Sequence, residues 1–242
     1  MIKIQHLTKT FGACSAVDDL SLEVEAGEIF GFLGPNGAGK TTTVKILSGI
    51  MAPTSGRVLV DGSDMALEPL AAKRCVAYVP DEPFVYPKLT GFEFMRFLGD
   101  LYDVPHQEQL LRIPQLLENF ELASRGGELL EAYSHGMKQK LLMAGVLLRR
   151  PKVVLFDEPT VGLDPKSIRR FKTMLSEMAG NGAAVFMCTH ILEMAEKLCT
   201  SVGIIHRGRL VVKDTVAAVK RLAAGTGEKS LEDVFLELTG EA

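Results

Sequence analysis

The sequence predicts an α/β protein with a helical insertion in its middle. Short apolar runs bounded by glycine and proline fill the first third of the chain, which is typical of β-strands. Residues 90–150 instead carry apolar side chains at helical spacing, and the strand pattern returns from residue 153. This order predicts a core of strands and helices that is interrupted by the insertion and followed by a short helical tail.

The composition is that of an ordinary folded protein. The 242 residues include 27 basic and 30 acidic side chains, a formal net charge of −3, and 47% are hydrophobic. These values exclude a disordered or fibrous chain, and the acidic balance disfavours a nucleic-acid-binding protein. The four cysteines form no Cys-x-x-Cys pair, so we expect reduced, buried thiols. The longest uninterrupted apolar run, 141–148, is too short to cross a membrane.

The predicted strands differ in how many faces they bury. Residues 20–24 alternate between apolar and polar side chains, which predicts one buried face. Residues 28–33 are almost wholly apolar, which predicts a strand buried on both faces. Further strands are predicted at 56–62, 75–79, 153–156, 183–188 and 202–205.

The predicted helices begin at recognisable capping residues. Thr90 and Glu93 form a capping box before apolar positions 94, 97, 98 and 101. A second helical stretch at 108–122 is broken or restarted by Pro114. Asp164-Pro165 begins a helix that ends near residue 180, with 168, 171, 175 and 178 on its inner face. In the tail, Ser230 and Asp233 cap an amphipathic helix whose apolar side is Leu231, Val234, Phe235 and Leu238.

A glycine-rich phosphate-binding motif follows the most buried early strand. Residues 34–41, GPNGAGKT, match GxxxxGK[ST], and helical residues 42–50 come next. The glycines let backbone N–H groups surround phosphate oxygens at a helix N-terminus. Lys40 is placed for the β- and γ-phosphates, and Thr41 supplies a hydroxyl to Mg²⁺. An ordinary glycine-rich turn is the less favoured alternative, because motif and context agree.

Two later strands end in residues suited to the same chemistry. Asp157 and Glu158 follow the strand at 153–156, where ligand-facing groups of a parallel sheet lie. We expect Asp157 beside Thr41 at Mg²⁺, and Glu158 to polarise the attacking water. His190 follows the strand at 183–188 and is a candidate for a γ-phosphate contact. Taken alone, an acidic turn and an ordinary surface histidine are the alternatives.

A second predicted anion site lies at the start of another helix. Ser134 and Gly136 open the apolar helix that runs to Arg149. A serine and a glycine at a helix N-terminus leave backbone N–H groups available to an anion. Without the other motifs, a plain N-cap is the favoured interpretation.

In this order and spacing, the motifs resemble those of the ATP-binding subunit of an ABC transporter over nearly the whole chain. The resemblance finds Walker A in GPNGAGKTT, the signature in YSHGMKQ, Walker B in VLFDEPT, the D-loop in VGLDP and the H-switch in Thr189-His190. It implies a P-loop NTPase (RecA-like) core with an antiparallel β subdomain and an inserted α-helical subdomain. The whole chain, 1–242, is then one ATPase domain. Its parts are the core at 1–83 and 151–212, the helical subdomain with the signature at 84–150, and the tail at 213–242.

The resemblance also implies the roles of individual residues. Catalysis is assigned to Glu158, His190 and Asp81, and Mg²⁺ binding to Thr41 and Asp157. ATP binding is assigned to Phe11, whose ring stacks on adenine, and to Gly34, Pro35, Asn36, Gly37, Ala38, Gly39, Lys40, Thr41, Thr42, Ser134, Gly136 and Asp164.

The partners implied by the resemblance are a second copy and a membrane protein. Ser134 and Gly136 of one subunit contact the ATP held by the other, which gives a head-to-tail homodimer on ATP binding. ATP hydrolysis then powers export of an unidentified substrate through a separate integral membrane permease docked on 84–127. The resemblance also implies that no nucleic acid is bound, and that the chain is cytoplasmic and peripheral on the inner face of the cell membrane.

Three positions depart from the family pattern. Asp81 stands where the family usually has glutamine, and an ionised carboxylate accepts but does not donate hydrogen bonds. Glu82 is a second candidate for that role. His135 and Met137 replace the more frequent glycine and glutamine, and histidine adds strain if its position requires a positive φ. Phe11 replaces the commoner tyrosine, which changes little because stacking uses the ring.

Two alternative functions stay open at this point. One is a soluble ABC ATPase that acts on ribosomes or DNA, although the acidic net charge disfavours it. The other is an ATP-binding subunit that hydrolyses ATP very slowly because of Asp81.

Overall fold

The computed structural model describes residues 1–160, 164–222 and 230–240. The chain divides into two units of dense internal packing. The first unit comprises residues 1–78, 152–158 and 172–242, and the second comprises residues 79–151 and 159–171. All five phosphate-site candidates of the core, at 40, 41, 157, 158 and 190, belong to the first unit.

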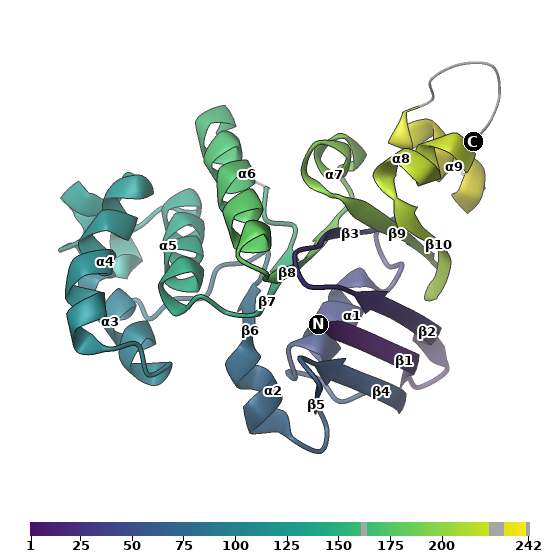
Figure 1. The fold of residues 1–242 in the computed structure, drawn as a ribbon, viewed down its shortest axis with the longest axis horizontal. Helices are drawn as coiled ribbons and strands as arrows, with labels where there is room; N and C mark the ends of the chain where they lie inside the picture. Colours follow the sequence, from purple (N-terminus) through teal and green to yellow (C-terminus); the bar gives the residue numbers. More distant parts are fainter. Residues whose placement is uncertain (161–163, 223–229, 241–242) are drawn as a thin grey trace. The chain divides into compact units, whose positions relative to one another are not determined.

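The first unit contains an antiparallel sheet in the order β2-β1-β4-β5 (Figure 1). Its strands are β1 (Ile2–Phe11), β2 (Cys14–Val24), β4 (Ser55–Val60) and β5 (Ser63–Asp64). The alternation predicted at residues 20–24 is confirmed, since Leu20, Leu22 and Val24 are buried while the residues between them are exposed. One face of this sheet therefore supplies apolar side chains to the core.

The second sheet of this unit has the order β10-β9-β3-β8-β7-β6. Its strands are β3 (Ile29–Leu33), β6 (Val76–Val79), β7 (Val153–Asp157), β8 (Ala184–Thr189), β9 (Ser201–His206) and β10 (Arg209–Thr215). Strands β7, β8, β3 and β9 run parallel in adjacent pairs, so their carboxyl ends meet at one edge. Every residue of β3 and β7 is buried, as the apolar runs predict. The rings of Phe30 and Phe32 each lie 5.3 Å from that of Phe186 at the centre of this core.

The helices of this unit connect these strands or follow the last of them. They are α1 (Lys40–Leu47), α2 (Pro69–Cys75), α7 (Leu192–Leu198), α8 (Val216–Leu222) and α9 (Leu231–Thr239), together with α6 (Pro165–Gly180), which begins in the second unit and ends in the first. The capping box of α9 is confirmed, and its buried residues include Leu231, Val234 and Phe235. Leu238 is 37% exposed, so the prediction that it joins the apolar side is wrong. On α6, Phe171, Leu175 and Met178 are buried as predicted, and Ile168 is half-buried.

The second unit is built mainly from three helices that lie side by side in Figure 1. They are α3 (Gly91–Leu101), α4 (His106–Asn119) and α5 (His135–Arg149). The capping box of Thr90 and Glu93 is confirmed at the start of α3. Phe94 is buried, but Phe97 and Leu101 are 39% and 56% exposed. The predicted apolar face of α3 is therefore only partly used for packing within the chain.

Helix α4 continues through Pro114, so the predicted break is wrong. A proline in a helix removes one N–H and leaves the carbonyl one turn earlier without its partner. Pro114 lies on the exposed side, where water can hydrate that carbonyl. The opposite side holds the helix in place, because Ile113 and Leu117 are buried and Arg112 donates hydrogen bonds to the carbonyls of Leu147 and Leu148.

The four cysteines are free, and the prediction that they are buried holds best for Cys188. Cys14 is exposed, because it begins β2 directly after the turn from β1. Among the described residues, no helix combines the length and the apolar character that a bilayer crossing requires.

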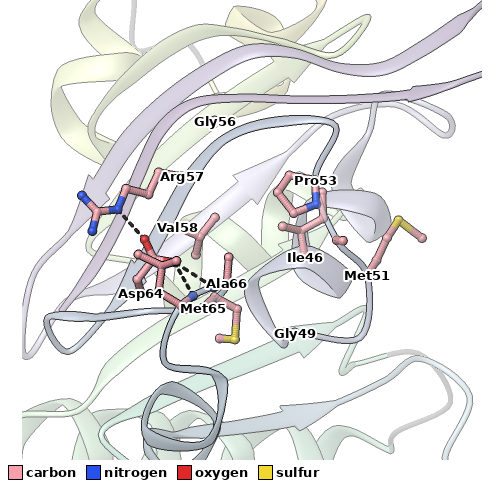
Figure 2. A pocket seen from close by; sticks show the side chains of 12 residues that line it. Ile46, Gly49, Met51, Pro53, Gly56, Arg57, Val58, Asp64, Met65 and Ala66 are labelled. Atoms are coloured by element: carbon pink, nitrogen blue, oxygen red, sulfur yellow. Dashed lines mark hydrogen bonds and ion pairs between the residues drawn. The ribbon is translucent and has the colours of Figure 1, made fainter.

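A pocket of about 410 Å³ lies between the end of α1 and strands β4 and β5 (Figure 2). Its walls include Ile46, Pro53, Val58 and Met65. At its edge the Asp64 carboxylate accepts hydrogen bonds from the N–H groups of Ala66 (2.7 Å) and Leu67 (3.1 Å) and from Arg57. No residue of the predicted phosphate site lines this pocket.

We expect Asp64→Asn to destabilise the protein in a pH-dependent way. The hydrogen bond from Arg57 and those from the backbone lower the pKa of Asp64 below its usual 3.8. A carboxylate with a lowered folded-state pKa stabilises the protein above its unfolded pKa, and this stabilisation is lost as the pH falls through the folded pKa. The variant should lose about 1–2 kcal/mol at pH 7, a value that allows for the partial exposure of Arg57.

Urea unfolding at pH 7 and near pH 3 measures this difference. The gap between wild type and Asp64→Asn should shrink at the lower pH. Asp61→Asn is the matched control, because Asp61 forms a more exposed ion pair with Lys152 at 2.6 Å. An equal gap at both pH values would show that the Asp64 charge does not stabilise the fold.

Candidate active site

The loop at residues 34–39 joins β3 to α1, and two of its positions have no room for a residue larger than glycine. Gly39 has a φ of 108°, and a Cβ there would lie 2.3 Å from the carbonyl oxygen of Ala16. A Cβ on Gly34 would lie 2.5 Å from the carbonyl oxygen of Ile205. Both glycines therefore let the loop pass close to neighbouring backbone, as a phosphate-binding loop requires. In the same loop, Pro35 is half-buried, Asn36 and Gly37 are exposed, and Ala38 is buried.

Lys40 is held across this loop. It is the first residue of α1 and only 7% exposed, and its Nζ donates to the carbonyl oxygens of Gly34 (2.6 Å) and Pro35 (3.1 Å). The Thr43 hydroxyl donates to the carbonyl of Gly39 at 2.9 Å and fixes the other side of the turn. A buried ammonium at a helix N-terminus provides a strong site for an anion. The neighbouring Thr41 is exposed and Thr42 is half-buried.

Two carboxylates stand at the end of β7. Asp157 is the last residue of the strand and is 1% exposed. Glu158 follows with a φ of 47°, a conformation that costs a non-glycine residue free energy and often marks a functional site. Its N–H donates to the carbonyl of Cys188 at 3.0 Å, which continues the pairing with β8 for one more step. The turn thereby exposes part of the Glu158 side chain at the strand ends.

His190 contacts this second carboxylate. Its ring atom Nδ1 lies 2.8 Å from Oε1 of Glu158, and its backbone N–H donates a hydrogen bond to Oε2 of Glu158 at 3.4 Å. The register of the sheet brings the two residues close, because Asp157 pairs with Cys188, and Glu158 and His190 follow these residues by one and two positions. The His190 side chain is 49% exposed, so the ring is accessible from outside the contact.

The charges of the phosphate loop and of β7 act on one buried group. Burial raises the pKa of the Cys188 thiol well above its usual value, the negative charges of Asp157 and Glu158 raise it further, and the positive charge of Lys40 opposes them. Helix α1 also packs against β7 and β8. Lys40, Asp157, Glu158 and His190 are therefore brought together, as the strand-end argument predicts.

The oxygen atoms available here suit Mg²⁺. Asp157 offers a carboxylate and Thr41 an exposed hydroxyl, and both are the hard oxygen ligands that Mg²⁺ prefers. Within the described part of the chain, no three His, Cys, Asp or Glu side chains are grouped as a metal site. The donor set therefore fits an ion that takes most of its ligands from phosphate and water rather than one enclosed by protein.

Phe11 ends β1 with half of its surface exposed. The Nζ of Lys9 lies 5.1 Å from the centre of its ring, so a cation already faces the aromatic surface. The exposed ring is available for stacking on a planar ligand.

Ser134 and Gly136 lie in the second unit, at the N-terminus of α5. Ser134 is the N-cap, and its Oγ accepts a hydrogen bond from the N–H of Met137 at 3.3 Å. His135 is the first helical residue and does not have a positive φ, so the strain considered for this position does not arise. The predicted anion site thus has the expected local geometry.

The remaining candidates also lie in the second unit. Asp81 is exposed, and its Oδ1 accepts the N–H of Glu82 at 2.8 Å. Asp164 accepts hydrogen bonds from the N–H (2.9 Å) and hydroxyl (2.7 Å) of Ser167, which lower its pKa to about 2. It therefore caps α6 as predicted. The D-loop residues 161–163 lie outside the described residues.

Comparison with known proteins places these motifs in context. The family described as ABC transporter matches residues 17–161. The linearmycin resistance ATP-binding protein LnrL of Bacillus subtilis is 34% identical over 89% of this chain and 69% of its own length. The probable multidrug ABC transporter ATP-binding protein YbhF of Escherichia coli is 34% identical over 98% of this chain, which spans only 41% of YbhF. A solved structure of an ATP-binding subunit of an ABC transporter has a TM-score of 0.94 and 34% identity, with 99% of both chains covered.

Proposed function

This chain belongs to the ABC transporter family as an ATP-binding, ATP-hydrolysing protein, and we propose that the residues at the ends of β3, β7 and β8 carry out the reaction. Lys40 binds the β- and γ-phosphates, and the loop N–H groups surround them. The observation that carries the proposal is the 2.8 Å contact between Glu158 and His190 beside this loop. Steady-state ATPase measurements with the Glu158 and Lys40 variants argued in the Discussion test it.

Each side chain has a distinct task in this proposal. Glu158 accepts a hydrogen bond from the attacking water and orients that water in line with the γ-phosphate. His190 keeps Nδ1 on Glu158, which leaves the Nε2 edge of the ring for the γ-phosphate. Thr41 and Asp157 would hold Mg²⁺, which neutralises phosphate charge when bound. Phe11 stacks on the adenine ring.

We further propose that ATP joins two copies of the chain head to tail. Ser134 is exposed at the N-terminus of a 15-residue helix, where unpaired N–H groups and the helix dipole favour an anion. In a twofold dimer, Ser134 and Gly136 of one copy would contact the γ-phosphate bound by Lys40 of the other. Loss of that phosphate on hydrolysis removes the contact and releases the copies.

A charge placed at this helix start should block pairing without unfolding the helix. Glutamate is well tolerated in the first turn of a helix, but in Gly136→Glu it would repel the γ-phosphate. We expect the ATP-dependent dimer of a Glu158→Gln background to be lost in gel filtration. The matched control is Gly136→Gln, which has the same size and no charge. A dimer that persists in Gly136→Glu would exclude this helix start from the interface.

We propose that a membrane permease docks on the second unit and that the chain works at the inner face of the cell membrane. Phe84 and Tyr86 are 75% and 47% exposed, and Tyr86 packs against Phe97 with ring centres 5.4 Å apart. An exposed cluster of large apolar rings is typical of a protein interface. The resistance function in the name of LnrL favours export as the direction of transport. The cargo is chosen by the permease.

Affinity capture from detergent-solubilised membranes tests the permease proposal. Wild type should retain an integral membrane protein, and Phe84→Asp should not. Leu70→Asp, at an exposed apolar position of α2 in the first unit, is the control and should still retain it. Recovery of RNA or DNA in its place would support the soluble alternative.

Steady-state ATPase assays of wild type and Asp81→Gln decide whether Asp81 slows hydrolysis.

A further inference from the structure

The C-terminal helix packs beneath the start of the phosphate loop. Leu33, the last residue of β3 before the loop, belongs to one buried cluster with Leu231, Val234 and Phe235 of α9. Ala195 of α7 is in the same cluster and has no exposed surface. The tail therefore forms part of the core that supports the candidate active site.

Helix α7 connects this core to His190. It begins at Leu192, two residues after His190, and has seven residues. The N-cap, Ile191, has no capping side chain, although its N–H donates to the Thr189 hydroxyl at 3.0 Å. A helix of two turns is not stable by itself, so contacts with other elements must fix its position.

Glu196 provides two of those contacts through its two carboxylate oxygens, beside the apolar packing of Ala195. Oε1 accepts from Nζ of Lys220 on α8 at 2.5 Å, and Oε2 accepts from the N–H of Leu231 at 3.3 Å. Leu231 is the first residue of α9, where an N–H lacks a partner within the helix and a negative charge is favoured. The Glu196 and Lys220 side chains are both 31% exposed, so water screens the pair only in part. A single side chain thus joins α7, α8 and α9.

Helix α7 carries a second glutamate, Glu193, whose ion-pair partner lies on the same helix. Glu193 pairs with Lys197 four residues later, so both partners lie on α7. Its side chain is 75% exposed. Glu193 and Glu196 therefore differ in what they connect rather than in chemical type.

We propose that Glu196 is a positioning residue for ATP hydrolysis. By fastening α7 to the two C-terminal helices, it holds the turn that places His190 against Glu158. The inference rests on the proposed function of these two residues. It assigns to the tail a task in catalysis that the site residues alone do not reveal.

Glu196→Gln tests this role against Glu193→Gln. We expect kcat for ATP hydrolysis to fall about 3- to 10-fold in Glu196→Gln, with KM for ATP within about twofold of wild type. Glu193→Gln should match wild type in both constants. A purely structural defect would lower the amount of active enzyme and the melting temperature without displacing His190.

The histidine ring signals measured by NMR without nucleotide provide a readout that is independent of turnover. The His190 signal, assigned by its loss in His190→Asn, should shift in Glu196→Gln and stay in place in Glu193→Gln. Lys220→Met removes the other half of the ion pair and should reproduce the shift, and it decides the matter if Glu196→Gln does not fold. Wild-type kcat and an unmoved His190 signal in the folded variants would overturn the proposal. Normal turnover in Glu158→Gln would instead overturn the proposed function itself.

Discussion

Glu158→Gln should slow steady-state ATP turnover by at least about 10²-fold, because general-base catalysis contributes about 10²- to 10⁴-fold and an amide cannot accept the proton of the attacking water. The substitution keeps the size of the side chain, so the turn at φ 47° and the packing beside His190 should persist. ATP affinity should stay within a few-fold of wild type, since Lys40 and the loop are unchanged. ATPase assays and equilibrium ATP binding measure the two effects separately.

A trapped dimer is the second expected property of this variant. If ATP joins two copies and hydrolysis releases them, slow hydrolysis should leave an ATP-bound dimer that gel filtration resolves from the monomer. Glu193→Gln controls for loss of one negative charge near the same turn and should behave as wild type. A Glu158→Gln protein that stays monomeric and turns over ATP normally would contradict the assigned role.

Local sequence patterns predicted the parts of the fold that depend on local physics. The buried strand at 28–33, the capping boxes at Thr90 and Ser230 and the phosphate loop are each encoded within a few residues, and each is found as expected. The same holds for the cap at Ser134. In these segments, side-chain periodicity and backbone hydrogen bonding suffice to choose one conformation.

The remaining features depend on contacts between distant segments. The contact of Glu158 with His190 joins residues 32 apart and follows from the register of β7 and β8, which no local pattern contains. The same is true of Glu196, whose partners lie on two later helices. The predicted break at Pro114 was wrong because the exposure of its helix face, which makes a proline tolerable, is a tertiary property. Helix α2 was not predicted, since its seven residues have one buried side chain and hence no apolar periodicity.

Lys40→Ala should weaken ATP binding rather than slow the chemical step. The ammonium is 7% exposed and lies at the start of α1, within hydrogen-bond distance of the carbonyl oxygens of Gly34 and Pro35. A charged hydrogen bond in such a site contributes about 1.5–3 kcal/mol, which corresponds to a Kd for ATP that is about 10- to 150-fold weaker. Calorimetric titration of wild type and variant with ATP measures this directly.

The control for Lys40→Ala is Lys45→Ala. Lys45 lies in the last turn of the same helix and is half-buried. Lys45→Ala therefore removes one positive charge and some side-chain packing, as Lys40→Ala does, but at the opposite end of α1. Its ATP affinity should equal that of wild type, because the helix N-terminus is untouched. If Lys40→Ala also bound ATP with wild-type affinity while remaining folded, residues 34–41 would not form the phosphate site. Every role assigned to Asp157, Glu158 and His190 from their position beside that loop would then fail with it.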